Sequence, residues 1–311
     1  MAANNSVIGG EYSMHQINDR VILVQVLVAV FLCINLFLIT TFFMKELYTT
    51  MRYILFVITL LSDCLLLFIT DILLILNYFH FTIQIWLCLI IYIVVSLYTF
   101  VTPVTLTAMT LERYVAICMP LRHGELCSTC SALHCILIIH VLSSVPCIVI
   151  LSIFFVSATH SFYTQRRICS VETFIFYKWQ GHLRSAISQF YFLIMCITIV
   201  FSYLRIMKVA KAASGENRKS TWKGLRTVIL HAFQLLLCLI QLWCPLIEAA
   251  LLQINFMLYI NVRYFNYITF ILAPRCLSPL IYGLRDEIFF HALKYYVLCC
   301  FVKNNSFHLT N

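Results

Sequence analysis

The sequence predicts an all-α membrane protein, a bundle of seven transmembrane helices. Hydrophobic residues make up 62% of the 311 residues and charged residues only 11%, which is outside the usual range of soluble proteins. Seven apolar stretches are long enough to span a membrane, because a helix needs roughly 20 residues to cross the hydrocarbon core. These stretches do not alternate in polarity as the strands of a β-barrel would. The chain is therefore expected to lie mostly in lipid.

The expected helices follow one another with short connections over Val21–Met44, Tyr53–Tyr78, Ile85–Cys118, Ser131–Val156, Ser185–Met207, Arg226–Gln253 and Val262–Gly283. The first apolar run lacks a small-residue cleavage site and is long enough to span, so we expect a membrane anchor rather than a cleaved signal peptide. The chain then divides into an N-terminal segment (1–20), a membrane domain (21–283) and a C-terminal tail (284–311).

Lysine and arginine are distributed unevenly between the two sides of the predicted bundle. The side that holds the C-terminus carries fourteen, whereas the other side carries six, namely Arg20, Arg166, Arg167, Lys178, Arg184 and Arg263. Because cytoplasmic segments are enriched in these residues, we expect an extracellular N-terminus and a cytoplasmic C-terminus. Asn4, in the tripeptide Asn4-Asn5-Ser6, would then be open to N-glycosylation. The positive charges form no basic face, so nucleic acid is not an expected partner.

Two of the fifteen cysteines are expected to form a disulfide. Most of the others lie within predicted helices or on the cytoplasmic side, where disulfides are rare. Cys88, at the outer end of the third span, and Cys169, in the long outer segment, are accessible to oxidation and have no competing partner. Their bond would tie the outer segment across the mouth of the bundle.

Other cysteines suggest weaker possibilities. Cys127 and Cys130, with His123 and His134 nearby, are spaced like a short zinc site, but zinc motifs usually separate two such pairs by about a dozen residues or more. Reduced thiols are therefore favoured, and no metal is expected. Cys299-Cys300 follows an amphipathic stretch close to the membrane, where reversible palmitoylation is chemically reasonable.

Asp63 lies near the middle of the second span, where an ionisable side chain is costly and usually marks function. Asn35, Thr102 and Ser278 lie at compatible depths in the first, third and seventh spans, so these four side chains are predicted to form a polar cluster. The favoured interpretation is a hub that holds a sodium ion or water and couples the helices. The alternative is a carboxyl group that only satisfies neighbouring hydroxyls. Arg275 lies within the seventh span.

The run Glu112-Arg113-Tyr114 ends the third span at its cytoplasmic edge. Adjacent glutamate and arginine can form a local ion pair, which would act as a latch if arginine changed partner when a helix moved. A solvated pair at the membrane surface would have the same composition. Charge alone favours the surface pair.

Several motifs together resemble the rhodopsin-like (class A) G-protein-coupled receptors. They are Asn35, the run Leu60-Leu61-Ser62-Asp63, Cys88 placed 25 residues before Arg113, and Pro279-Leu280-Ile281-Tyr282. Within that superfamily, residues 111–123 resemble the odorant-receptor signature at the third helix and second inner loop. Residues 202–206, Lys223 with Thr227-Val228 and His231, and residues 278–285 resemble the same family's helices five, six and seven. The resemblance covers nearly the whole chain and is closest to odorant receptors of teleost fish.

The resemblance implies a plasma-membrane receptor that binds a small-molecule odorant among helices three, five, six and seven. Candidates for the wall of the site are Val95, Ser96, Thr99, Ile187, Tyr191, Trp243 and Ile268. Mostly apolar groups with a few hydroxyls suit a small-molecule site. For each of them, plain helix packing is an equally good interpretation.

The resemblance also implies a mechanism of activation. Helix six would swing outward, and Arg113 would leave Glu112 and turn toward Tyr203, while Pro279 and Tyr282 belong to the motif that closes helix seven. The expected partner is a heterotrimeric G protein of the olfactory, stimulatory type, with rising cyclic AMP. A receptor kinase and arrestin are further expected partners. Residues 285–296 would form a short amphipathic eighth helix on the membrane.

The sequence departs from the wider family pattern at three positions. Thr59 stands where leucine is usual, His140 stands about where the fourth helix has tryptophan, and Ser278 replaces the common asparagine before proline. The changes at Thr59 and Ser278 alter the make-up of the polar cluster. The switch residue of helix six is open between Trp243 and Leu239.

Other function classes fit the sequence less well. A transporter or channel would thread polar residues through the whole bundle, and these are sparse here. Neither H-E-x-x-H nor G-x-S-x-G occurs, so no motif indicates a membrane enzyme. Val95 stands where amine receptors have an acidic residue, and the seventh span has no lysine for a retinal Schiff base. A non-olfactory class A receptor for a small molecule is the nearest alternative.

Overall fold

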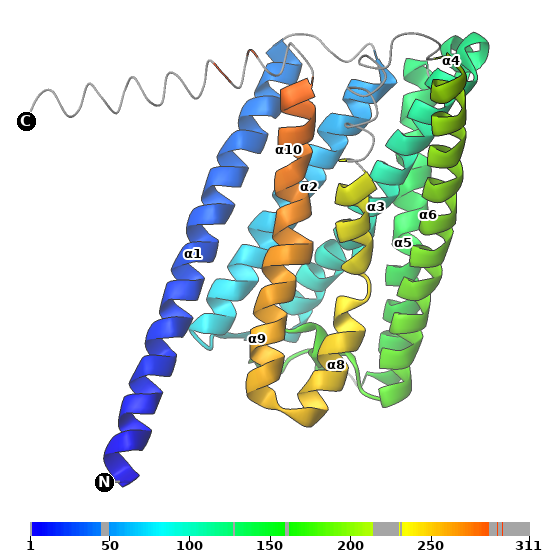
Figure 1. The fold of residues 1–311 in the computed structure, drawn as a ribbon. Helices are drawn as coiled ribbons and strands as arrows, with labels where there is room; N and C mark the ends of the chain where they lie inside the picture. Colours follow the sequence, from blue (N-terminus) through cyan, green and yellow to red (C-terminus); the bar gives the residue numbers. More distant parts are fainter. Residues whose placement is uncertain are drawn as a thin grey trace, which may run out of the picture.

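The computed structural model describes residues 2–44, 50–126, 128–158, 162–213, 230, 232–285, 291 and 294. Within these residues, five helices are long and apolar enough to cross a membrane: α1 (Ala2–Met44), α2 (Met51–Tyr78), α3 (Ile85–Cys118), α5 (Thr129–Ser157) and α6 (Lys178–Ala213). They pack side by side in a bundle, and the short helix α4 (Pro120–Leu126) lies at one end (Figure 1).

The bounds of the long helices follow the hydrophobic pattern to different degrees. The third helix has the expected bounds, and the second and fourth expected spans, which correspond to α2 and α5, agree to within two residues at each end. In contrast, α6 continues beyond its apolar core at both ends, because polar residues can extend a helix into the aqueous layers. Helix α1 begins at Ala2, so residues 2–20 are continuous with the first apolar helix.

The sixth expected span is broken in its middle. A helical segment over residues 232–240 is followed by a turn at residues 241–243 and then by α8 (Cys244–Ile254). Pro245 lies in the first turn of α8 and has no N–H, so it cannot donate to the carbonyl one turn earlier. Tight backbone bonds from Leu242 to Leu239 (3.0 Å) and from Trp243 to Ile240 (2.9 Å) form the turn instead.

The seventh expected span consists of three consecutive parts. They are α9 (Phe256–Asn266), a π-helical segment η4 (Tyr267–Leu272) and α10 (Ala273–Arg285). The π-helix precedes Pro274, whose missing N–H disfavours a regular α-helical turn at this point. Asn255 separates α8 from α9 and caps α9, because its side-chain oxygen accepts from the N–H groups of Met257 (2.9 Å) and Leu258 (3.2 Å).

Two short strands cover the end of the bundle opposite α4 (Figure 1). Strand β1 (Thr82–Gln84) pairs antiparallel with β2 (Arg166–Ile168), so that Thr82 is opposite Ile168. The hydrophobic pattern did not indicate this sheet, because three-residue strands carry too little periodicity. A 3-10 turn, η3 (Val171–Phe174), follows β2 and completes the cover.

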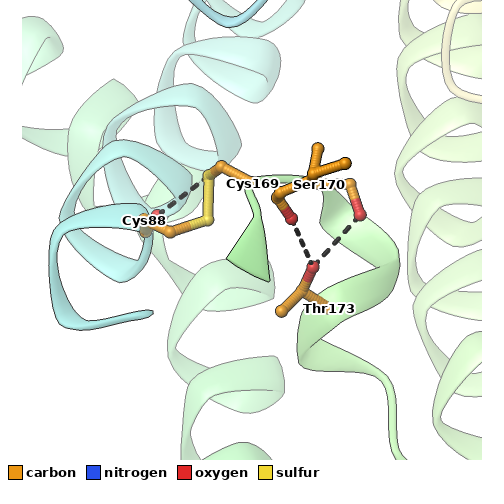
Figure 2. Close-up of a disulfide and its surroundings, with 5 residues drawn as sticks. Cys88, Cys169, Ser170 and Thr173 are labelled. Carbon is orange, nitrogen blue, oxygen red and sulfur yellow. Dashed lines mark hydrogen bonds between the residues drawn. A yellow bond between two sulfur atoms is a disulfide. The ribbon is translucent and has the colours of Figure 1, made fainter. Parts of the chain in front are cut away.

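A disulfide fixes this cover to the bundle. Cys88, in the first turn of α3, is bonded to Cys169, which directly follows β2, with the two Cα atoms 5.5 Å apart (Figure 2). The predicted pair is therefore confirmed. Beyond Cys169, the Thr173 hydroxyl lies 3.1 Å from the Ser170 hydroxyl and donates to the Ile168 carbonyl at 3.3 Å, so the chain folds back on itself.

Aromatic rings fill the space beneath the cover. The buried ring of Phe154, near the end of α5, lies against the rings of Phe162, Phe174 and Phe176, with centroids 5.2–6.1 Å apart. Tyr92 of α3 also packs on Phe174 at 4.8 Å. This apolar cluster and the disulfide attach the cover to both α3 and α5.

Several predictions concern residues of which the structure gives no description. The Asn4 side chain, Cys127, Lys223, Arg226, the Tyr282 side chain, Cys299 and Cys300 lie outside the described part, as does the expected eighth helix except for His291 and Lys294. For these residues the predictions stand as stated.

We expect Cys169→Ser to lower the amount of protein at the cell surface several-fold, because loss of a disulfide typically costs about 2–5 kcal/mol. The double variant Cys88→Ser/Cys169→Ser should be no worse than the single variant, since both remove the same bond. Surface biotinylation measures both. Cys33→Ser, at an exposed free cysteine of α1, is the matched control. Wild-type levels of Cys169→Ser would contradict this structural role.

Candidate functional site

The centre of the candidate site is Asp63, whose side chain is completely buried in α2. The hydroxyl of Thr102, in α3, donates to Asp63 Oδ1 at 3.0 Å. Ser278, in α10, lies near the same carboxyl group, and its hydroxyl donates to the Pro274 carbonyl at 3.5 Å. Three helices thus bring polar side chains together in an otherwise apolar layer, where an unpaired charge would be very costly.

The main partner of Asp63 is Arg275, which the predicted cluster did not include. Its Nε lies 3.5 Å from Asp63 Oδ1, and both side chains are fully buried. Arg275 heads the group of largest side chains that are completely buried. The sequence signal was a charged residue within an apolar span. What the sequence could not supply was the rotation of α10 that turns this residue toward α2.

The Arg275 guanidinium also forms hydrogen bonds with the turn that interrupts the sixth helix. Its two terminal nitrogens donate to Gln241 Oε1 at 3.3 and 3.4 Å, and one of them also donates to the Ile271 carbonyl in η4. Gln241 is the first residue of the turn that Pro245 imposes. Arginine therefore connects the irregular parts of helices six and seven to Asp63 in helix two.

A second hydrogen bond joins helices six and seven, between the segment 232–240 and α10. Gln234 Nε2 donates to Ser278 Oγ at 2.5 Å, and both side chains are buried. Asn35 of α1 is also fully buried, but its amide makes no hydrogen bond to Asp63 in the described part of the chain. The polar cluster therefore comprises Asp63, Thr102, Gln234, Gln241, Arg275 and Ser278.

The predicted latch lies near the C-terminal end of α3, beside α4. Glu112 and Arg113 are only 8% and 7% exposed, so both side chains are buried in the bundle, which argues against a solvated surface pair. Glu112 Oε1 lies 3.4 Å from Nε2 of His123 in α4, a contact that the sequence did not suggest. Tyr203 of α6 is buried in the main apolar cluster, and the ring of Tyr114 lies 6.1 Å from that of Phe201.

The predicted ligand-wall residues do not all lie together. Tyr191 of α6 donates to the Leu142 carbonyl of α5 at 2.6 Å and packs against Phe100 of α3, so its hydroxyl is directed toward α5. The Thr99 hydroxyl donates to the Val95 carbonyl of its own helix. Val95, Ser96 and Ile187 are half-buried.

The two remaining candidates lie in helices six and seven. Trp243 is 38% exposed with its ring 5.8 Å from Phe192, whereas Leu239 is buried in the main core. Ile268 packs against the apolar cluster of α1, α2 and helix seven that includes Val28. Its neighbours are thus different from those of Trp243.

An apolar groove of about 330 Å³ lies between α6 and the helical segment 232–240. Tyr203 and Leu239 are among its lining residues, and the other side chains around it are also mostly hydrophobic. None of the predicted ligand-wall residues lines this groove. Its exposed rim includes Val200 and Leu204, so the groove faces the surface that lipid would cover.

Among the residues that the structure describes, no group of three or more histidine, cysteine or acidic side chains could hold a metal ion. Cys130 and His134 lie one turn apart in α5, with Sγ 3.9 Å from Nδ1, while Cys127 is not described. The expected absence of a metal stays a prediction.

Comparison with known proteins relates the chain to seven-transmembrane receptors. A family model described as 7 transmembrane receptor (rhodopsin family) matches residues 34–282, a range that includes Asp63, Arg113 and Arg275. Odorant receptor 131-2 of Danio rerio is 41% identical over 298 residues, which are 96% of this chain and 92% of that protein. Galanin receptor 2a of Danio rerio is 25% identical over 232 residues, covering 70% of this chain and 60% of that protein.

We expect Thr102→Val to destabilise the protein by about 1.5–3 kcal/mol, because it removes a hydrogen bond to a buried charged group while keeping the side-chain shape. The melting temperature of the detergent-purified protein measures this loss. Thr105→Val is the matched control, since the Thr105 hydroxyl is equally buried in α3 but donates only to its own helix at Val101. An equal fall in both variants would refute the importance of the bond to Asp63.

Proposed function

The chain belongs to the rhodopsin family of seven-transmembrane receptors, and on this basis we propose that it is an odorant receptor that signals through a stimulatory G protein. The observation that carries the proposal is 41% identity to an odorant receptor over 96% of the chain. Members of the family are receptors rather than enzymes, and they are multi-pass membrane proteins. The predicted seven-helix membrane fold is thus confirmed.

The proposed ligand is a small molecule that binds in the outer half of the bundle. The walls would be Val95, Ser96 and Thr99 of α3, Ile187 and Tyr191 of α6, Trp243 at the start of α8, and Ile268 of η4. Apart from the exposed Trp243, these are half-buried side chains, mostly apolar with a few hydroxyls, which supports the assignment because such surfaces bind small organic molecules. The cover formed by β1, β2 and the disulfide would limit access from outside.

The proposed signalling end is the inner end of α3. Glu112 contacts His123 of α4, so in the resting arrangement the glutamate joins α3 to the short helix that follows it. Activation would move Arg113 toward Tyr203 as helix six shifts, with Tyr114, Pro279 and Tyr282 as further parts of this machinery. A ligand drives such a change only by binding the active arrangement more tightly than the resting one.

The proposed setting is the plasma membrane, with the N-terminus outside and the C-terminus in the cytoplasm. The distribution of lysine and arginine supports this orientation. Glycosylation at Asn4 and palmitoylation at Cys299 and Cys300 would follow from it. The proposed partners are a stimulatory G protein that raises cyclic AMP, a receptor kinase and arrestin.

We expect Arg113→Ala to reduce agonist-driven cyclic AMP to the level of cells without the receptor, while surface biotinylation stays near the wild-type level. The reason is that Arg113 would act only after helix six moves. Arg205→Ala is the control, because Arg205 is an exposed arginine of α6 that stacks on Phe201. Undiminished signalling by Arg113→Ala would disprove the latch.

The overall function is tested by exposing cells that express the chain to water-soluble odorants, with cyclic AMP as readout. Amino acids, bile acids, steroids and small volatile compounds are the classes to screen. We expect a response that Arg113→Ala abolishes. Ligand-dependent flux of ions or solute that persists in Arg113→Ala cells would instead indicate a channel or transporter.

A further inference from the structure

The polar cluster contains a permanent positive charge of its own. A guanidinium stays protonated at every physiological pH, so Arg275 is always charged. Its Nε lies 3.5 Å from Asp63 Oδ1, and neither side chain is exposed. The other members of the cluster, Thr102, Gln234, Gln241 and Ser278, are neutral. Within this cluster, the charges of Asp63 and Arg275 therefore cancel.

This arrangement does not fit the sodium ion that the position of Asp63 first suggested. A hard cation needs several oxygen ligands around it and a negative charge to offset its own. Here Asp63 Oδ1 already receives the Thr102 hydroxyl at 3.0 Å and faces the arginine. Oδ2 accepts no hydrogen bond from the described residues, but the two oxygens share one charge. A cation at Oδ2 would compete with Arg275 for that charge.

The amide oxygen of Gln241 is also occupied by arginine. Gln241 Oε1 accepts from both terminal nitrogens of Arg275, at 3.3 and 3.4 Å. The Ile271 carbonyl, which the π-helix leaves close by, accepts from the same guanidinium. Gln241 Oε1 and the Ile271 carbonyl, two oxygens that could serve a cation here, are thus oriented toward arginine.

We propose that Arg275 is the built-in counter-ion of Asp63, so that this receptor binds no sodium ion in its core and instead couples helices two, six and seven through a covalently attached cation. A bound ion can leave or be replaced, whereas Arg275 cannot dissociate. Helix seven therefore carries the charge that holds it to helix two, and the same guanidinium holds the break of helix six at Gln241. The proposal does not depend on the ligand.

The pair is tested by separating its charges and then removing both. We expect Asp63→Asn and Arg275→Gln each to lower surface biotinylation at least about fivefold, since each leaves one buried charge without its partner. The double variant Asp63→Asn/Arg275→Gln should recover most of that loss. Matched controls are Asp71→Asn, at a half-buried aspartate of α2, and Arg263→Gln, at a half-buried arginine of α9, which should change the surface level much less.

Sodium dependence is tested on the wild-type protein, so this measurement does not require any variant to fold. The melting temperature of purified receptor in nanodiscs is compared in about 150 mM sodium chloride and in choline chloride at equal ionic strength. We expect the same melting temperature in both salts. A specific stabilisation by sodium would overturn the proposal, as would a double variant that reaches the surface as poorly as the worse single variant.

Discussion

The structure depends on the fact that hydrocarbon offers no hydrogen bonds, so every polar group in the membrane must find a partner within the chain. The long helices meet this demand for the backbone. Hydroxyl side chains meet it locally, as at Thr59, Thr105 and Thr110, each of which donates to a carbonyl one turn earlier in its own helix. The buried charges of Asp63 and Arg275 find their partners on other helices, and these contacts link helices two, six and seven.

The hydrophobic pattern predicted most of the fold because lipid makes strict demands on length and composition. Helices α2 and α3 lie almost where their apolar runs predict, and the disulfide follows from the location of Cys88 and Cys169 at the same end of the predicted bundle. The pattern was less informative at helix ends, where polar residues are tolerated. It therefore missed the extension of α6 and the helical continuation of α1 toward Ala2.

The candidate site was only partly predictable. Depth along each helix brought Asp63, Thr102 and Ser278 together, because depth can be counted in residues. Rotation about each helix axis cannot be read in the same way, and it decides that Arg275 faces Asp63. The partner Gln241 depends on a further irregularity, the turn that precedes Pro245. A proline signals that a helix can break, but not which neighbouring side chain the break will turn inward.

The two breaks divide helices six and seven into an outer and an inner half. Asn266 Nδ2 donates to Glu248 Oε1 at 3.0 Å and cross-links α8 to α9, while Gln234 and Ser278 cross-link the inner halves. Each pair of half-helices is therefore held together by its own hydrogen bond. The two pairs meet at Gln241 and Arg275. Pro245 and Pro274 donate no backbone hydrogen bond at these junctions. The guanidinium of Arg275 therefore joins helices six and seven at the places where their backbones are least regular.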